Sequence, residues 1–249
     1  MNTPTKQLPP ARELEARVEA VRALSAHSFE IELQLPAEAA FLAGQYLELL
    51  LADGRAVPYS IASAPANLPV AMLHILDQGE GSLSGVVLDH LRSCSTVSLR
   101  MPSGNCVLDP ERLGPETELV LIAAGSGFAQ MKSIMEQVVA EQLSNPVHLY
   151  WGVKSADQLY GEALVREWSA AHPSFRYVPV VEGDESWSGR TGLVHHAVLA
   201  DFDRLDRVEV FVCGSPAMVY AVEDDFLPQG LRQGHIHSDV YSYAPRSLS

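Results

Sequence analysis

Two turns of the chain combine small residues with the start of a helix, which is an arrangement that holds phosphate groups. The first turn is Gly125-Ser126-Gly127, between the apolar run Leu119–Ala124 and an amphipathic segment that begins at Phe128. Glycine lets the backbone approach an anion closely, and a helix start offers free N–H groups and the positive end of the helix dipole. An ordinary tight turn is an equal alternative, because the sequence has neither the full GxGxxG spacing nor the Gly-Lys-Ser/Thr of a P-loop.

The second turn is Cys213-Gly214-Ser215-Pro216, which follows the apolar run Val208–Cys213. Ser215 suits a helix N-cap and Pro216 suits the first helical position. In an open α/β sheet, ligands bind at the strand ends where the strand order reverses, so Cys213 is expected at the edge of such a crevice. Taken alone, a cysteine at a strand end is more often a small buried apolar residue than a reactive group.

Two earlier segments could bind a flat, anionic ligand. The segment Pro58-Tyr59-Ser60-Ile61, preceded by Gly44-Gln45-Tyr46, offers an aromatic plane and a hydroxyl group. A cross-strand aromatic pair of Tyr46 with Tyr59 is the alternative interpretation. The segment Gly81-Ser82-Leu83-Ser84 precedes a predicted helix and forms a small anion site by the same dipole argument. Capping of that helix by Ser82 explains the segment equally well.

The elements that must position these segments change character midway along the chain. Residues 15–108 show the short alternating runs typical of a β-sandwich or barrel, with one helix at Leu83–Arg92 buried through Val86, Val87, Leu88 and Leu91. After the turn-rich stretch Asp109–Thr117, strands alternate with amphipathic helices, which predicts a parallel sheet with helices on both faces. The sequence therefore predicts two domains, over residues 12–112 and 113–249, after a loose tail of eleven residues.

The composition excludes several classes of partner. The chain has 249 residues, with 31 acidic against 17 basic residues and a formal net charge of −14. Such a surface repels nucleic acid and anionic membranes. The longest apolar runs are too short for a membrane span and the start does not resemble a signal peptide, so a cytoplasmic location is expected.

No metal site is predicted. Histidines come close together at 195–196 and at 235–237, but these segments have the pattern of an ordinary helix and a terminal loop. The cysteines are too far apart in the sequence for a CxxC site; they are Cys94, Cys106 and Cys213.

Taken together and in this order, the segments resemble the ferredoxin–NADP reductase superfamily, and its compact NAD(P)H–flavin oxidoreductases in particular. The resemblance covers the chain from about Leu14 to Tyr243. It implies an antiparallel flavin-binding β-barrel followed by an α/β NAD(P)H-binding domain, with the flavin ring between them. The matching segments are Gly44–Tyr46, Pro58–Ser63, Gly81–Ser84, Ala124–Phe128, Tyr150–Gly152, Gly189–Gly192, Cys213–Pro216 and His237–Tyr241.

The resemblance also implies roles for individual residues. In the flavin site, which takes FAD or FMN, Tyr59 packs on the ring and Ser60 lies near N5, and the same site contains Tyr46, Pro58 and Ile61. The flavin phosphate contacts the turn that contains Gly81, Ser82 and Ser84.

In the implied NADPH or NADH site, the pyrophosphate lies over Gly125, Ser126 and Gly127, and the nicotinamide lies beside Cys213, Gly214 and Ser215. Lys154 is a candidate partner of a 2′-phosphate, and Asp239 and Tyr241 close the site. The residues expected to act in hydride transfer, as positioning and polarising groups and not as nucleophiles, are Ser60, Cys213 and Asp239.

The sequence departs from the family at three positions, which are Val57, Gln130 and Lys154; Lys154 stands where the family often has an arginine. Val57 stands where the family motif has an arginine, which favours a flavin that exchanges as a substrate or one that is anchored differently. Arg55 lies nearby and either reaches a phosphate or is a solvated turn residue. Gln130 replaces a proline that is common after the glycine turn.

Three functions are compatible with these observations. The leading hypothesis is an enzyme, an NAD(P)H-dependent flavin reductase that transfers hydride from nicotinamide to flavin N5. The second is an FAD-bound reductase component that passes electrons to a separate oxygenase or electron-transfer protein. The third is a non-catalytic regulatory module that binds flavin or nucleotide.

Overall fold

The computed structural model describes residues 10–184 and 186–246. Its internal contacts divide the chain into two units. The first unit contains residues up to Leu113 together with Lys132–Gln142, and the second contains Gly114–Met131 and the chain from Leu143 onward. Most of the predicted loose tail, residues 1–9, lies outside the described residues. No helix of the described part is long and apolar enough to cross a membrane.

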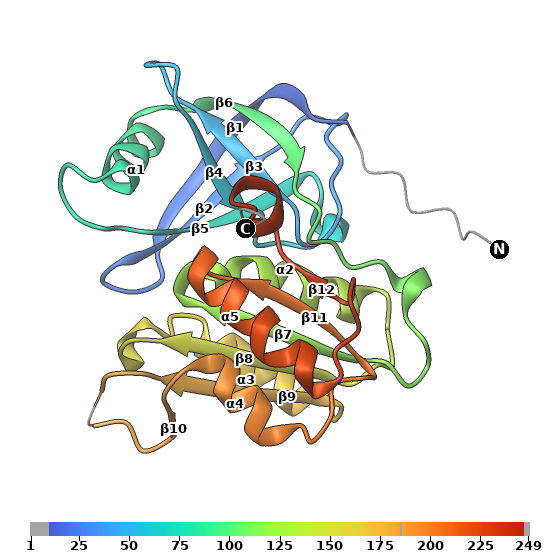
Figure 1. Cartoon of the computed structure of the whole chain (residues 1–249). Helices are drawn as coiled ribbons and strands as arrows, with labels where there is room; N and C mark the ends of the chain where they lie inside the picture. Colours follow the sequence, from blue (N-terminus) through green and yellow to red (C-terminus); the bar gives the residue numbers. More distant parts are fainter. Residues whose placement is uncertain (1–9, 185, 247–249) are drawn as a thin grey trace. The chain divides into compact units, whose positions relative to one another are not determined.

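The first unit is an antiparallel β-barrel (Figure 1). Its strand order is β4-β3-β6-β1-β2-β5. The two edge strands meet, because Ile61 forms an antiparallel bridge to Leu73 and the Ala62 N–H donates to Met72 O at 2.7 Å. The strands are β1 (Arg12–Ala23), β2 (Ser28–Gln34), β3 (Tyr46–Leu50), β4 (Ala56–Ser60), β5 (Val70–Leu76) and β6 (Thr96–Ser103).

The helix α1 (Leu83–Ser93) packs on this barrel as the apolar spacing predicts, with one exception. Val87, Leu88 and Leu91 are buried, whereas Val86 is 41% exposed, so the prediction that Val86 is buried was wrong. The buried residues follow the i, i+1, i+4 positions of one helix face, and Val86 lies beside that face.

The second unit is a parallel sheet covered by helices (Figure 1). Its strand order is β10-β9-β8-β7-β11-β12. The strands are β7 (Glu118–Ala124), β8 (Val147–Val153), β9 (Phe175–Val181), β10 (Arg190–Thr191), β11 (Val208–Cys213) and β12 (Ile236–His237). The α-helices are α2 (Phe128–Ala140), α3 (Glu162–Ala171), α4 (Val194–Asp201), α5 (Pro216–Phe226) and α6 (Val240–Tyr243).

Short 3₁₀ helices occupy several of the connections. They are η1 (Pro65–Asn67), η2 (Pro110–Arg112), η3 (Gly125–Gly127), η4 (Ala156–Gln158) and η5 (Leu227–Gln229). The helix α2 belongs to both units, since its first turn falls in the second unit and the remainder falls in the first.

The order in which successive strands are added reverses at the centre of the parallel sheet. From β7 successive strands are added on one side, as β8, β9 and β10. The chain then crosses to the other side of β7, where β11 and β12 are added. Helices α4 and α5 lie side by side on one face, where Val198 and Val222 join a core with Val120 of β7 (Figure 1). The reversal falls between β7 and β11, so the ligand crevice of this topology lies at the carboxyl ends of these two strands.

The predicted fold class, an antiparallel β-barrel followed by a parallel α/β domain, is confirmed. The exact boundary between residues 112 and 113 stays a prediction. The sequence did not predict β10, β12 and α6, because segments of two to four residues show no periodicity.

Candidate functional site

The glycine turn after β7 is a short 3₁₀ helix that leads directly into α2. Gly125 has a φ of +52°, a conformation that favours glycine, and a Cβ added there would meet no atom within 4 Å. Ser126 is exposed, and the Trp151 indole donates to Gly125 O at 2.9 Å, which fixes the turn to β8. The turn therefore has the open backbone surface that a phosphate group requires.

Gly127 fixes the distance between this turn and the end of β11. A Cβ at Gly127 would lie 2.4 Å from the carbonyl oxygen of Cys213, so only glycine fits without displacement of the backbone. A Cβ at Gly214 would in turn lie 3.3 Å from the Cβ of Ala124. The two predicted turns are thus in contact at the carboxyl ends of neighbouring strands.

The second turn starts α5 as predicted. The Ser215 hydroxyl accepts a hydrogen bond from the Met218 N–H at 3.3 Å, and Pro216 is the first residue of the helix. Cys213 and Gly214 are partly exposed and Ser215 is exposed, so this segment presents both backbone and a thiol at the crevice.

Three aromatic side chains pack together next to the glycine turn. Phe128 stacks on Trp151 with ring centroids 4.0 Å apart, and Tyr160 meets both rings edge-on. A Cβ at Gly161 would lie 2.5 Å from the Phe128 ring, which shows how closely this layer is packed. The first residue of α2 is therefore part of a densely packed aromatic cluster.

The segment after β12 brings Asp239 to α2. The Gln130 side chain donates to Asp239 Oδ2 at 2.7 Å, so the residue that replaces the family's proline holds the predicted acidic residue. Tyr241 packs edge-on against Tyr220 with ring centroids 5.8 Å apart. The sequence marked Gln130 only as a departure from the family and did not indicate this contact.

Lys154 follows the end of β8 and is exposed. Its backbone N–H donates to Gln158 Oε1 at 3.1 Å, which orders the loop at this position. The side chain is therefore on the same strand-end side of the sheet as the two turns, since β8 pairs in parallel with β7.

In the first unit, strands β3 and β4 bring Tyr46 and Ser60 together as direct cross-strand partners. The alternative pairing of Tyr46 with Tyr59 was wrong, because the register places Leu47 opposite Tyr59. Successive residues of a strand point to opposite faces, so Ser60 shares a face with Tyr46, and Tyr59 shares the core-facing side with Leu47.

The other residues of this segment differ in exposure. Pro58 is exposed, whereas the side chain of Ile61 is fully buried in the barrel core, which leaves only its backbone for a ligand. Partial burial raises the pKa of Tyr59 to about 12, so its phenol stays protonated throughout the physiological range.

Three side chains of α2 hold the backbone that follows Ser60. Lys132 Nζ donates to Ala62 O at 2.8 Å, Ser133 Oγ donates to Ser63 O at 2.8 Å, and Glu136 accepts from the Ala64 N–H at 2.9 Å. Sequence reasoning missed these residues. The available signal was a Lys-Ser pair within an otherwise apolar run of the helix.

The predicted anion turn before α1 is organised by its own hydroxyl groups. Ser82 Oγ accepts from the Gly85 N–H at 3.0 Å, which confirms the capping role, and Ser84 Oγ accepts from the Gln78 N–H at 3.0 Å. Gly81 has a φ of +77° and open space around it. Within the described residues, the Leu83 and Ser84 N–H groups have no protein acceptor, so the helix start retains donors for an anion.

The cations next to β3 and β4 are already paired with carboxylates. Arg55 contacts Asp53 at 2.7 Å, and Arg100 contacts Glu48 at 2.7 Å. Val57 is only 6% exposed and packs in the barrel core. The open backbone surface at Gly81 and Gly125 is compatible with the phosphate groups of both expected ligands, whereas β4 contains no arginine that could bind a flavin phosphate.

Comparisons with known proteins agree with this geometry. Residues 121–224 match the family model of the oxidoreductase NAD-binding domain. The chain is 31% identical to an NAD(P)H-flavin reductase of Aliivibrio fischeri over 92% of this chain and 99% of that protein. The crystal structure of the Amycolatopsis cytochrome P450 reductase GcoB superposes with a TM-score of 0.85 at 30% identity, covering 92% of this chain and 70% of that one.

The chain therefore belongs to the ferredoxin–NADP reductase superfamily. It is also 36% identical to the CDP-6-deoxy-L-threo-D-glycero-4-hexulose-3-dehydrase reductase of Yersinia pestis, over 85% of this chain but only 63% of that protein's length. The predicted family, which is a family of oxidoreductases, is confirmed, and the two predicted cofactor classes, flavin and nicotinamide nucleotide, agree with this family. The individual site residues stay predictions.

Proposed function

We propose that the chain is an NAD(P)H-dependent flavin reductase that binds flavin as an exchangeable substrate. The observation that carries the proposal is the contact of Gly127 with Cys213 at the point where the strand order of the parallel sheet reverses, beside the open turn at Gly125. The similarity to the Aliivibrio fischeri enzyme over nearly its whole length supports the same function.

The chain's own residues would bind, orient and shield the reactants. The turn at Gly125 and the start of α2 hold the pyrophosphate, and the Cys213–Gly214 backbone borders the nicotinamide. Ser60 offers a hydroxyl beside the reacting edge of the flavin, and Asp239 is oriented by Gln130. A bound flavin would supply the redox chemistry of hydride transfer, and these residues would bind and orient it.

The paired arginines favour an exchangeable flavin over a tightly held one. A flavin phosphate gains most from an unpaired guanidinium, and both Arg55 and Arg100 are engaged by carboxylates. The remaining anchor is the backbone at the start of α1, which is a weaker and more easily reversed contact.

A second function rests on a separate set of relatives. The chain is 32% identical to reductase component 2 of a Comamonas terephthalate 1,2-dioxygenase, over 86% of this chain and 64% of that protein. This similarity favours transfer of electrons from a bound FAD to a partner protein. A cytoplasmic location is compatible with either function and stays a proposal.

Gel filtration followed by an NAD(P)H oxidation assay separates the two functions. The exchangeable-flavin proposal predicts a protein that leaves the column almost free of flavin and oxidises NAD(P)H only after FMN, FAD or riboflavin is added. A protein that retains one FAD per chain and reduces added flavin poorly would support the electron-transfer component instead.

A further inference from the structure

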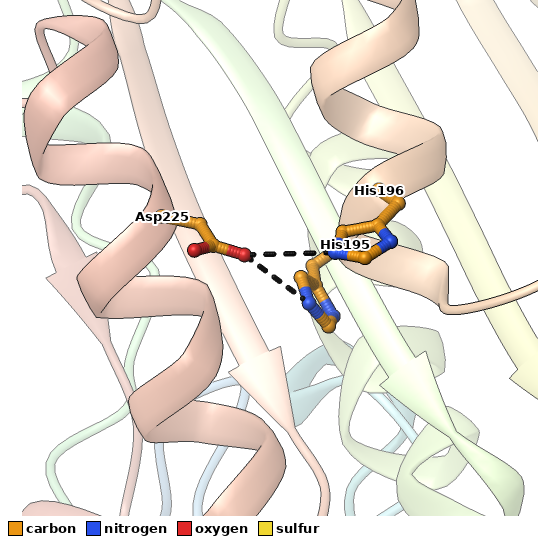
Figure 2. Close-up of side chains that lie close together, drawn as sticks. All are labelled: His195, His196 and Asp225. Atoms are coloured by element: carbon orange, nitrogen blue, oxygen red, sulfur yellow. Dashed lines mark ion pairs between the residues drawn. The ribbon is translucent and has the colours of Figure 1, made fainter.

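A cluster of metal-binding side chains joins two helices on one face of the second unit. His195 and His196 lie in the first turn of α4, and Asp225 lies in the last turn of α5. Figure 2 shows both imidazole rings directed toward the carboxylate of Asp225. The Nε2 atoms of His195 and His196 lie 3.3 Å and 3.8 Å from Asp225 Oδ2.

The spacing of these atoms matches a coordination sphere better than it matches hydrogen bonding. All three candidate ligand atoms lie within 4.8 Å of one another. A tetrahedral Zn²⁺ with bonds of about 2.0–2.1 Å separates its ligand atoms by roughly 3.4 Å. Both His–Asp distances exceed the usual N–H···O range of about 2.7–3.2 Å. A small convergence of the side chains would therefore close the site around an ion.

The charges around Asp225 also favour a cation. Among the described residues no lysine or arginine pairs with Asp225, and the carboxylate lies at the C-terminal end of α5, where the helix dipole is negative. The chain as a whole carries a formal net charge of −14. The neighbouring carboxylate of Asp224, in contrast, is already paired with Arg246 at 2.6 Å.

A second histidine cluster in the same unit shows the geometry of two imidazoles that each make a short contact with a carboxylate. Glu209 is buried, and its two oxygen atoms are separately engaged by His235 Nδ1 at 2.9 Å and His237 Nε2 at 2.7 Å. Each imidazole there has its own short contact, so each oxygen atom of the carboxylate has a partner. At α4 and α5 both imidazoles instead converge on the same oxygen atom at longer distances.

We propose that His195, His196 and Asp225 form a binding site for a divalent transition-metal ion, with Zn²⁺ as the best match. Two imidazole nitrogens and one carboxylate oxygen suit Zn²⁺, Ni²⁺ and Cu²⁺, whereas Mg²⁺ and Ca²⁺ prefer all-oxygen ligands. His196 and Asp225 have side chains 61% and 40% exposed, so water completes the coordination. The ion crosslinks α4 and α5 and thereby stabilises the second unit. It takes no part in hydride transfer.

Isothermal titration of the purified chain with ZnCl₂ tests the site, after removal of metals and in a buffer without phosphate. The variants are His196→Gln, at an exposed position, and Asp225→Asn, at a half-buried position; neither side chain belongs to the hydrophobic core. The control is His27→Gln, which removes an exposed histidine from the first unit. The proposal predicts that both site variants lose one Zn²⁺ site or bind it at least roughly tenfold more weakly, while the control matches the wild type.

Thermal unfolding provides a second readout that does not depend on activity. Zn²⁺ should raise the melting temperature of the wild type and of His27→Gln by several degrees and should leave both site variants unchanged. MgCl₂ should have no effect on any of the four proteins. The proposal is overturned if the wild type binds no Zn²⁺ at micromolar concentrations, if both variants retain every site, or if Mg²⁺ binds as well as Zn²⁺.

Discussion

Gly127 and the carbonyl group of Cys213 approach so closely that a Cβ at Gly127 would lie 2.4 Å from the carbonyl oxygen. The contact joins the turn after β7 to the end of β11 at the point where the strand order reverses. It sets the width of the crevice that we assign to the nicotinamide nucleotide.

Replacement of Gly127 by alanine should therefore impair both stability and nucleotide binding. The added methyl group must displace the backbone of β11 or of the turn, which we expect to cost about 1–3 kcal/mol and to raise the KM for NAD(P)H at least tenfold. Steady-state kinetics and urea unfolding measure the two effects. Gly183→Ala is the matched control, because a Cβ there would meet only Lys154 O at an ordinary 3.6 Å. Wild-type KM in Gly127→Ala would contradict the assignment of the crevice.

Lys132 holds the backbone that carries Ser60. Replacement of Lys132 by methionine removes the donor to Ala62 O and leaves the carboxylate of Glu136 without its positively charged partner. We expect a loss of about 2–3 kcal/mol of stability and a higher KM for flavin, with little change in the KM for NAD(P)H. Glu141→Ala, at an exposed position just after the end of the same helix, should behave like the wild type. An equal rise in both KM values would show that Lys132 supports the fold generally and does not position the flavin segment.

The hydroxyl group of Ser60 should affect the rate of flavin reduction more than flavin affinity. Ser60→Ala keeps the β3–β4 pairing with Tyr46 but removes the polar group expected near N5. We predict a tenfold or greater decrease in the rate of flavin reduction in stopped-flow experiments, on the order of 1.4 kcal/mol in the barrier. Ser98→Ala, on the exposed side of β6, is the control. A normal rate in Ser60→Ala would remove Ser60 from the mechanism.

Gln130 and Asp239 should act as one unit. The amide of Gln130 donates to Asp239 Oδ2 at 2.7 Å, so Gln130→Ala removes one hydrogen bond that orients the carboxylate. We expect Gln130→Ala and Asp239→Asn to lower kcat by similar factors and the double variant to lower it little further, as coupled residues do. Fully additive effects on kcat would show that Gln130 does not act through Asp239.

Much of the site could be predicted because its signals are local. The turn at Gly125, the cap at Ser215 and the cap at Ser82 each depend on a few consecutive residues, and the structure has the caps as predicted. The spacing of apolar residues likewise predicted α1 and the amphipathic helix that begins at Phe128.

The missed contacts all depend on residues that are distant in the sequence. Lys132 meets Ala62 and Gln130 meets Asp239 only after two elements have packed together, and no periodic pattern indicates such partners. The pairing of Tyr46 with Ser60 depends on strand register, which a shift of one residue would change. His195 and His196 were noticed as a pair, but the third candidate ligand, Asp225, comes from another helix.

Part of the stability that the chain loses below about pH 4 should come from Asp201. Its side chain is only 7% exposed; this burial acts to raise its pKa, but hydrogen bonds from Arg190 and Tyr150 outweigh the burial and lower the pKa from 3.8. A carboxyl group whose pKa is lower in the folded chain stabilises the fold above the unfolded pKa, and this contribution is lost as the pH falls through the folded pKa.

Asp201→Asn should therefore destabilise the chain by about 1–3 kcal/mol at pH 7, and the difference from the wild type should shrink as the pH falls toward 3. Urea unfolding at both pH values measures the change. A difference that stays constant across this range would show that the carboxylate charge of Asp201 contributes nothing.

We propose that this chain reduces a flavin that it does not retain. The most direct measurement is the rate of NAD(P)H oxidation by gel-filtered protein under anaerobic conditions, with and without added FMN, together with the absorbance of the flavin itself. We expect no oxidation without FMN, and with FMN we expect a stoichiometric bleaching of the flavin as NAD(P)H is consumed. Absence of NAD(P)H oxidation with FMN, FAD and riboflavin alike would contradict it.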